Sequence, residues 1–129
     1  MKILVVEDDA VTRLHLEFLL RAFGYQVVSA PNAAGAWQHL ADPSVRVVIS
    51  DWWMPGIDGP EFCRQIRQRG GPHVYFILIT NQPDTAENFR ITSNAGVDDY
   101  MTKPVRPDDL KLRLVGAVRA LEQPPQAKS

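Results

Sequence analysis

The chain has 129 residues, which suits one domain with a single core and is too short for two ordinary domains. Hydrophobic residues make up 45% and charged residues 22%, a balance that is typical of a folded globular protein and excludes disorder for most of the chain. Lys and Arg number 14 against 15 Asp and Glu, so a net charge of -1 gives no support to direct nucleic-acid binding.

Helical patterns alternate along the chain with short runs rich in β-branched residues. The runs predict strands at residues 3–6, 26–28, 45–49, 75–79 and, more weakly, 97–101. Helices are predicted at residues 10–23, 33–40, 60–69, from 84 towards 94, and from 107 to 121. Asp84 followed by Glu87 resembles a capping box that starts the fourth helix. The apolar face of the first helix is predicted from helical spacing as Val11, Leu14, Phe18 and Ala22.

This alternation predicts the fold class. Five βα units imply right-handed crossovers and an α/β fold with a doubly wound parallel sheet. We assign residues 1–122 to one domain and residues 123–129, which have two prolines and no periodicity, to a tail or the start of a linker. No apolar stretch approaches the roughly 20 residues of a membrane span, and the single Cys63 agrees with a reducing compartment. We therefore expect a cytoplasmic protein that does not enter a membrane.

Chemically capable residues follow four of the five predicted strands. They are Glu7, Asp8 and Asp9 after the first strand, Asp51 after the third, Thr80 after the fourth, and Lys103 with Pro104 after the fifth. Taken singly, each has an ordinary alternative, because acidic residues often cap the next helix and lysines are usually solvated. Together they should lie on one edge of the sheet, where open α/β folds bind their ligands.

Carboxylates that converge at one edge repel one another unless a cation joins them or some protons stay bound. Hard oxygen ligands in this number suit Mg²⁺. An Asp nucleophile, a metal, a lysine and a hydroxyl form the set that phosphoryl transfer requires, and Asp51, Lys103 and Thr80 would supply the protein groups. An acidic loop after the first strand would repel the phosphates of a flavin or dinucleotide, so these ligands are disfavoured.

From residue 2 to residue 121 the sequence resembles the receiver domain of two-component response regulators. The resemblance rests on four motifs in order, Ile-Leu-Val-Val-Glu-Asp-Asp at 3–9, Asp-Trp-Trp-Met-Pro-Gly-Ile-Asp-Gly at 51–59, Ile-Thr at 79–80 and Asp-Asp-Tyr-Met-Thr-Lys-Pro at 98–104. It implies a flavodoxin-like, CheY-like sheet of strand order 2-1-3-4-5. It also implies a signalling phosphoacceptor, rather than a turnover enzyme, that takes a phosphoryl group from a histidine kinase onto Asp51.

The resemblance implies a Mg²⁺ site made from four residues. Asp8, Asp51 and the backbone carbonyl of Trp53 would bind the ion directly, and Glu7 would bind it through water. Asp9, one position further on, would cap the first helix.

The resemblance assigns roles at the fourth and fifth strands as well. Lys103 would pair with the phosphoryl group, and Thr80 would turn inward to hydrogen-bond it. Tyr100 would be an aromatic switch that moves inward with Thr80, and Pro104 would follow a cis peptide bond. Phosphorylation would then shift populations and remodel the surface of the fourth helix, fifth strand and fifth helix.

The implied partners are a sensor histidine kinase or a phosphotransfer protein. The remodelled surface would pair with a second copy or with an output domain, which would follow the tail. Asn81 stands where the family has a small residue, and Trp53 and Gln82 occupy rim positions that influence self-dephosphorylation. We expect Trp53 to shield the aspartyl phosphate from water. The plain alternative packs one of Trp52 and Trp53 under the loop and leaves the other half exposed.

Two other functions remain open. A receiver-like module could recognise partners without using phosphate, and the departures at Asn81 and Trp53 leave room for it. A hydrolase with an Asp nucleophile, such as a phosphatase, is the other. Such an enzyme would need a second acid two residues after the nucleophile, where this chain has Trp53.

Overall fold

The computed structural model describes residues 1–83 and 85–123, and the elements given below are those of this part of the chain. The strands form one parallel sheet: β1 (Lys2–Val6), β2 (Gln26–Ala30), β3 (Val45–Asp51), β4 (Tyr75–Thr80) and β5 (Asp99–Thr102). The helices are α1 (Ala10–Ala22), α2 (Ala33–Leu40), α3 (Gly59–Arg69), α4 (Ala86–Ala95) and α5 (Pro107–Glu122). The strand order is β2-β1-β3-β4-β5, which confirms the predicted doubly wound α/β fold.

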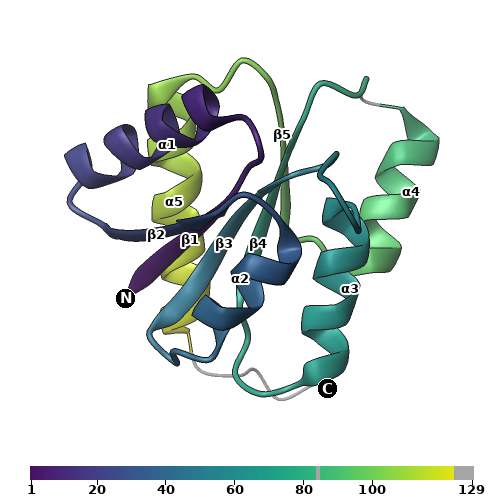
Figure 1. Ribbon diagram of the computed structural model, residues 1–129, viewed down its shortest axis with the longest axis horizontal. Helices are drawn as coiled ribbons and strands as arrows, with labels where there is room; N and C mark the ends of the chain where they lie inside the picture. Colours follow the sequence, from purple (N-terminus) through teal and green to yellow (C-terminus); the bar gives the residue numbers. More distant parts are fainter. Residues whose placement is uncertain (84, 124–129) are drawn as a thin grey trace.

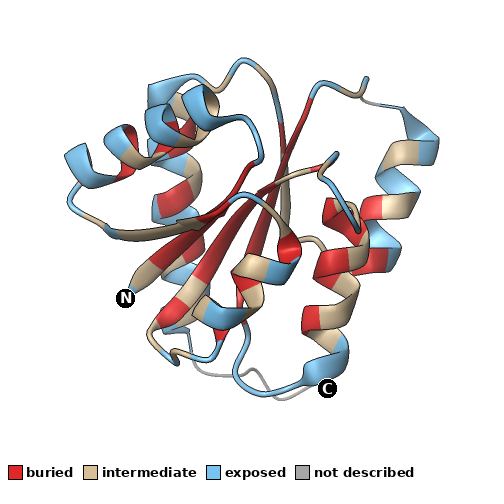
Figure 2. Ribbon diagram, in the orientation of Figure 1, coloured by how far each residue is buried: buried red, intermediate tan, exposed pale blue. Residues whose placement is uncertain are grey.

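The sheet separates two layers of helices. Helices α1 and α5 cover one face, and α2, α3 and α4 cover the other (Figure 1). Alternate residues of β1 point into different cores: Ile3 and Val5 pack with α1 and α5, whereas Leu4 and Val6 pack with α2 and α3. Burial therefore follows the central strands, and the outer sides of the helices are exposed (Figure 2). None of the helices in the described residues has the length and apolar character needed to cross a bilayer.

The predicted apolar face of α1 is wrong. Val11, Leu14 and Phe18 are 76%, 62% and 69% exposed, and Ala22 is exposed as well. The buried side chains are instead Leu16, Leu19 and Leu20.

Two polar contacts fix the rotation of α1 about its axis. Glu17 accepts a hydrogen bond from the Ser29 hydroxyl on β2, and Arg13 Nη1 donates to the carbonyl of Glu7 at 2.8 Å. Both side chains point towards the sheet, on the same side of the helix as Leu16 and Leu20. The stripe that contains Val11, Leu14 and Phe18 therefore faces solvent.

Helix α4 and strand β5 each begin and end one or two residues later than the sequence predicts. The predicted cap Asp84 lies outside the described residues, and Thr85 caps α4 by accepting the amide of Asn88 at 3.1 Å. Strand β5 starts at Asp99 rather than Val97, because the Val97 amide bonds back to the carbonyl of Thr92 at the end of α4. Of the predicted tail, only Gln123 lies within the described residues.

Candidate functional site

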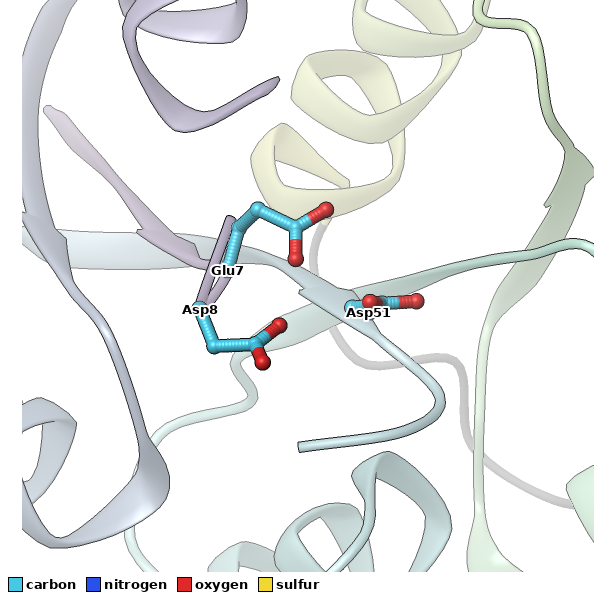
Figure 3. Close-up of side chains that lie close together, drawn as sticks. All are labelled: Glu7, Asp8 and Asp51. Atoms are coloured by element: carbon cyan, nitrogen blue, oxygen red, sulfur yellow. The ribbon is translucent and has the colours of Figure 1, made fainter. Parts of the chain in front are cut away.

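Strands β1 and β3 bring three carboxylates to one edge of the sheet. Val6 pairs with Ser50 in the parallel register, so the residues that come next, Glu7 and Asp51, are neighbours. Asp51 is the last residue of β3, and Asp8 follows Glu7 in the β1–α1 loop. One carboxylate oxygen from each of Glu7, Asp8 and Asp51 lies within 4.8 Å of the others, and the three side chains face a common space (Figure 3).

Lys103, the residue after β5 that the sequence pattern singled out, enters the same cluster. Its Nζ lies 3.0 Å from Glu7 Oε1 and 3.3 Å from Asp51 Oδ2. The backbone holds this position, because the Lys103 amide donates to the Thr80 carbonyl at 2.8 Å. The peptide bond between Lys103 and Pro104 is cis, as predicted.

Burial and charge set the protonation of this cluster. Glu7 is only 2% exposed, and desolvation raises its pKa to about 7, with the charge of Asp51 adding to the rise and the Lys103 hydrogen bond opposing it. For Lys103, burial favours the neutral amine, but the hydrogen bond to Glu7 and the charge of Asp51 prevail and raise its pKa. Lys103 therefore stays positively charged, and Glu7 gains or loses its proton near neutral pH.

The β3–α3 loop holds the Asp51 carboxylate in place. The amide of Trp52 donates to Asp51 Oδ1 at 2.8 Å, and the Gly59 amide donates to the Trp52 carbonyl at 2.7 Å. Gly59 is required here, because a Cβ at this position would lie 2.5 Å from the carbonyl oxygen of Asp51. Asp58 completes the loop by capping α3 through the Glu61 amide at 2.9 Å.

The β1–α1 loop is held from both ends. Asp9 caps α1, as predicted, by accepting the Thr12 amide at 2.9 Å. Arg13 contacts the backbone of Glu7 and so fixes the loop that carries the acidic pair. Arg13 follows the acidic motif after the first strand in the sequence, but its contact could not be predicted because it depends on the rotation of α1.

Thr80 and Tyr100 meet at Gln82 in the β4–α4 loop. The buried Thr80 hydroxyl accepts the Gln82 amide at 2.9 Å, and the Tyr100 hydroxyl donates to the Gln82 carbonyl at 3.0 Å. The Tyr100 ring also packs edge-on against Trp52, with ring centroids 6.4 Å apart. The residues predicted to act as a switch are thus connected through one loop residue.

The two tryptophans after Asp51 differ in exposure. Trp52 is 4% exposed and belongs to the core, whereas Trp53 is 58% exposed at the rim. The exposures agree with the plain alternative, in which one ring packs under the loop and the other is exposed, and the shielding expected of Trp53 stays a prediction. Asn81, the residue that follows β4, is exposed as well.

The donor set fits a divalent cation. With Glu7 ionised, three carboxylates and one ammonium leave a surplus of negative charge, and the donors are hard oxygens of the kind that Mg²⁺ prefers. An aspartate nucleophile with a lysine beside it is a combination that suits a phosphoryl acceptor, and Lys103 lies 3.3 Å from Asp51 Oδ2.

Known proteins share this sequence and fold. The sequence model of the family described as "Response regulator receiver domain" matches residues 3–115. The chain is 34% identical to the "Transcriptional regulatory protein ResD" of Bacillus subtilis over 122 residues, covering 95% of this chain and 50% of that protein. The chain spans about half the length of several curated relatives it matches.

Solved structures agree. A response regulator receiver domain protein from Clostridium thermocellum superposes with a TM-score of 0.83 at 29% identity, covering 92% of this chain and 94% of that one. The receiver domain of a sensor histidine kinase from Pseudomonas aeruginosa, solved with a magnesium ion coordinated in its active-site cleft, gives a TM-score of 0.81 at 27% identity, covering 92% and 97%. The chain therefore belongs to the family of response regulator receiver domains.

Proposed function

We propose that this protein accepts a phosphoryl group on Asp51 from a sensor histidine kinase or a phosphotransfer protein, as a signalling domain in the cytoplasm. The observation that carries the proposal is the placement of the Asp51 carboxylate beside Lys103, Glu7 and Asp8 at one edge of the sheet. In the transfer, an Asp51 oxygen forms a bond to phosphorus while the bond from phosphorus to the donor nitrogen breaks. The donor nitrogen keeps the electron pair.

The acidic residues would hold Mg²⁺ during this step. Asp8, Asp51 and the carbonyl of Trp53 would bind the ion directly, and Glu7 through water. When bound, Mg²⁺ neutralises charge on the transferring phosphoryl oxygens. Lys103 would pair with one phosphoryl oxygen, and the Thr80 hydroxyl would donate to another.

A hollow beside Lys103 is where a donor protein would approach the site. It has a volume of about 480 Å³, and its walls include Val11, His15, Asn81 and Pro104. The exposed apolar stripe of α1 runs on from Val11, so an incoming protein could contact α1 while it reaches Asp51.

Phosphorylation would act as a switch rather than as one step of enzymatic turnover. The negative charge on Asp51 would favour the arrangement with Thr80 and Tyr100 inward, and so would change the surface of α4, β5 and α5. That surface would pair with a second copy or with an output domain. The length of these relatives, about twice that of this chain, supports an output domain elsewhere in the full-length protein.

The test is the intact mass of the purified protein after incubation with a small phosphodonor and Mg²⁺. We expect a gain of one phosphoryl group that disappears in Asp51→Asn and when a chelator removes the metal. Asp51→Asn should remain folded with an unchanged or higher melting temperature, because it relieves carboxylate repulsion. An unmodified wild-type protein would instead mean either that Asn81 and Trp53 block access to Asp51 or that the protein is a phosphate-independent interaction module.

A further inference from the structure

Trp52 touches the phosphoacceptor through its backbone. Its amide donates to Asp51 Oδ1 at 2.8 Å and also to the Ile79 carbonyl on β4 at 3.0 Å. Its carbonyl accepts the Gly59 amide at the start of α3. Trp52 is therefore bonded to β4 and to α3 as well as to the acceptor, and its backbone has little freedom.

The indole ring of Trp52 lies on the other side, against the switch tyrosine. The ring is almost fully buried and packs in the core between the sheet and α3. It meets the half-buried Tyr100 ring edge to face, with an interplanar angle of 90°. This perpendicular arrangement is one that aromatic pairs favour, because the positive edge of one ring meets the negative face of the other.

Tyr100 is held at its far end by the β4–α4 loop. Its hydroxyl donates to the Gln82 carbonyl, and the Gln82 amide donates to the Thr80 hydroxyl. The Tyr100 ring thus lies between Trp52 and the loop residue that also binds Thr80. Removing the Trp52 ring would therefore take away one of the contacts that position Tyr100.

We propose that Trp52 is a positioning residue that holds the Tyr100 ring in the position seen here, between the Trp52 ring and the Gln82 carbonyl, and thereby couples the Asp51 site to the surface of β5 and α4. The proposal rests on the proposed function of Asp51 and Tyr100. Replacing the Trp52 side chain leaves its amide, and so the direct hydrogen bond to Asp51, in place. An effect of such a variant on binding at Asp51 that disappears without Tyr100 therefore travels through the contact between the two rings.

The first experiment observes Tyr100 directly, by fluorine NMR of protein labelled with 3-fluorotyrosine. The chain has three tyrosines, so Tyr25 and Tyr75 serve as internal references, and Tyr100→Phe assigns the signal. We expect Trp52→Leu to shift or broaden only the Tyr100 signal. The matched control is Trp37→Leu, because Trp37 packs on Phe62 in the same core, and we expect it to leave that signal unchanged. Trp52→Phe replaces Trp52→Leu if the latter does not fold.

The second experiment measures the affinity for beryllofluoride, which mimics the phosphoryl group on aspartate, in the presence of Mg²⁺. The strength of an aromatic pair predicts that Trp52→Leu raises the Kd by about 2- to 10-fold. In a Tyr100→Leu background the same change should have almost no effect on the Kd, since the residue through which it acts is gone. Trp37→Leu should leave the Kd unchanged in both backgrounds.

Two results would overturn the proposal: an unmoved Tyr100 signal in Trp52→Leu, or an equal change in Kd with and without Tyr100. Failure of the proposed function looks different, because the wild-type protein would then bind no beryllofluoride. In that case the fluorine signal of Tyr100 alone decides whether Trp52 positions it.

Discussion

Glu7 shows how one residue responds to its surroundings. Its carboxyl group is buried at the end of β1 and faces both Lys103 and Asp51, and desolvation raises its pKa from 4.5 to about 7. The folded protein consequently binds this proton more tightly than the unfolded chain does. The stabilising contribution of Glu7 is complete below pH 4.5 and is lost as the pH rises through 7.

Glu7→Gln should remove this pH dependence. With metal chelated, we expect the free energy of unfolding of the wild-type protein to fall relative to that of the variant by about 2 kcal/mol between pH 5 and pH 8. Urea denaturation at several pH values measures it. Glu122→Gln, at an exposed carboxylate on α5, is the control and should follow the wild-type profile. Parallel profiles for Glu7→Gln and wild type would contradict the prediction.

Trp53 is the exposed counterpart of Trp52. Its ring lies beside that of Trp52, with centroids 6.2 Å apart, at the rim of the acceptor site. If this ring shields the aspartyl phosphate from water, Trp53→Asn should shorten the lifetime of the phosphorylated protein several-fold. Decay of the phosphorylated mass after removal of the donor measures it, and an unchanged decay rate would show that the ring does not shield the site.

At the scale of elements, α1 illustrates the limit of periodicity. The helix carries two apolar stripes, and both have the spacing of a buried face. The Leu16, Leu19 and Leu20 stripe packs on the sheet, and the hydrogen bonds of Arg13 and Glu17 on the same side are consistent with this rotation. The other stripe, Val11, Leu14, Phe18 and Ala22, remains exposed on the surface.

A pair of substitutions on α1 separates the two stripes. Leu16→Ala should lower the free energy of unfolding by about 2–5 kcal/mol, since it leaves a cavity against β1 and β3. Phe18→Ala, at a side chain that is 69% exposed, should change it by about 0.5 kcal/mol or less. Chemical denaturation of both variants measures the difference, and a larger loss in Phe18→Ala would mean that the helix is rotated from the position described.

At the scale of the whole molecule, one carboxylate joins three segments at the end of the sheet opposite the acceptor site. Asp98 accepts the Phe76 amide at the start of β4 and pairs with Arg67 of α3, each at 2.8 Å. Arg67 also donates to the carbonyls of Gly96 and Val74. This cluster connects the end of α3 to β4 and to the turn between α4 and β5.

Asp98→Asn should therefore destabilise the fold without disabling the acceptor site. We expect the free energy of unfolding to fall by about 1–3 kcal/mol, because a charged pair and its hydrogen bonds are weakened. Beryllofluoride affinity should stay close to that of the wild type. Asp108→Asn, at an exposed position on α5, should cost only a few tenths of a kcal/mol by comparison. A comparable loss in both variants would argue against a specific role for the cluster.

Local patterns in the sequence determined much of this protein. Hydrophobic runs and turn residues were enough to predict five βα units, since strand and helix periods are properties of neighbouring residues. The acidic residues, Thr80 and Lys103 could be assigned to one sheet edge because the ends of parallel strands coincide there. The strand order and the cis bond before Pro104 could be predicted because the motifs resemble those of a known family.

Only the tertiary structure decided which surfaces meet. The buried face of α1 depends on Ser29, twelve residues beyond Glu17. The pKa of Glu7 depends on its burial in the fold, which raises it, and on the opposing hydrogen bond from Lys103, 96 residues away. The contact of Trp52 with Tyr100 has no local signal either. A sequence pattern records the period of an element but not its rotation against its neighbours, and rotation is set by long-range contacts that exist only once the chain has folded.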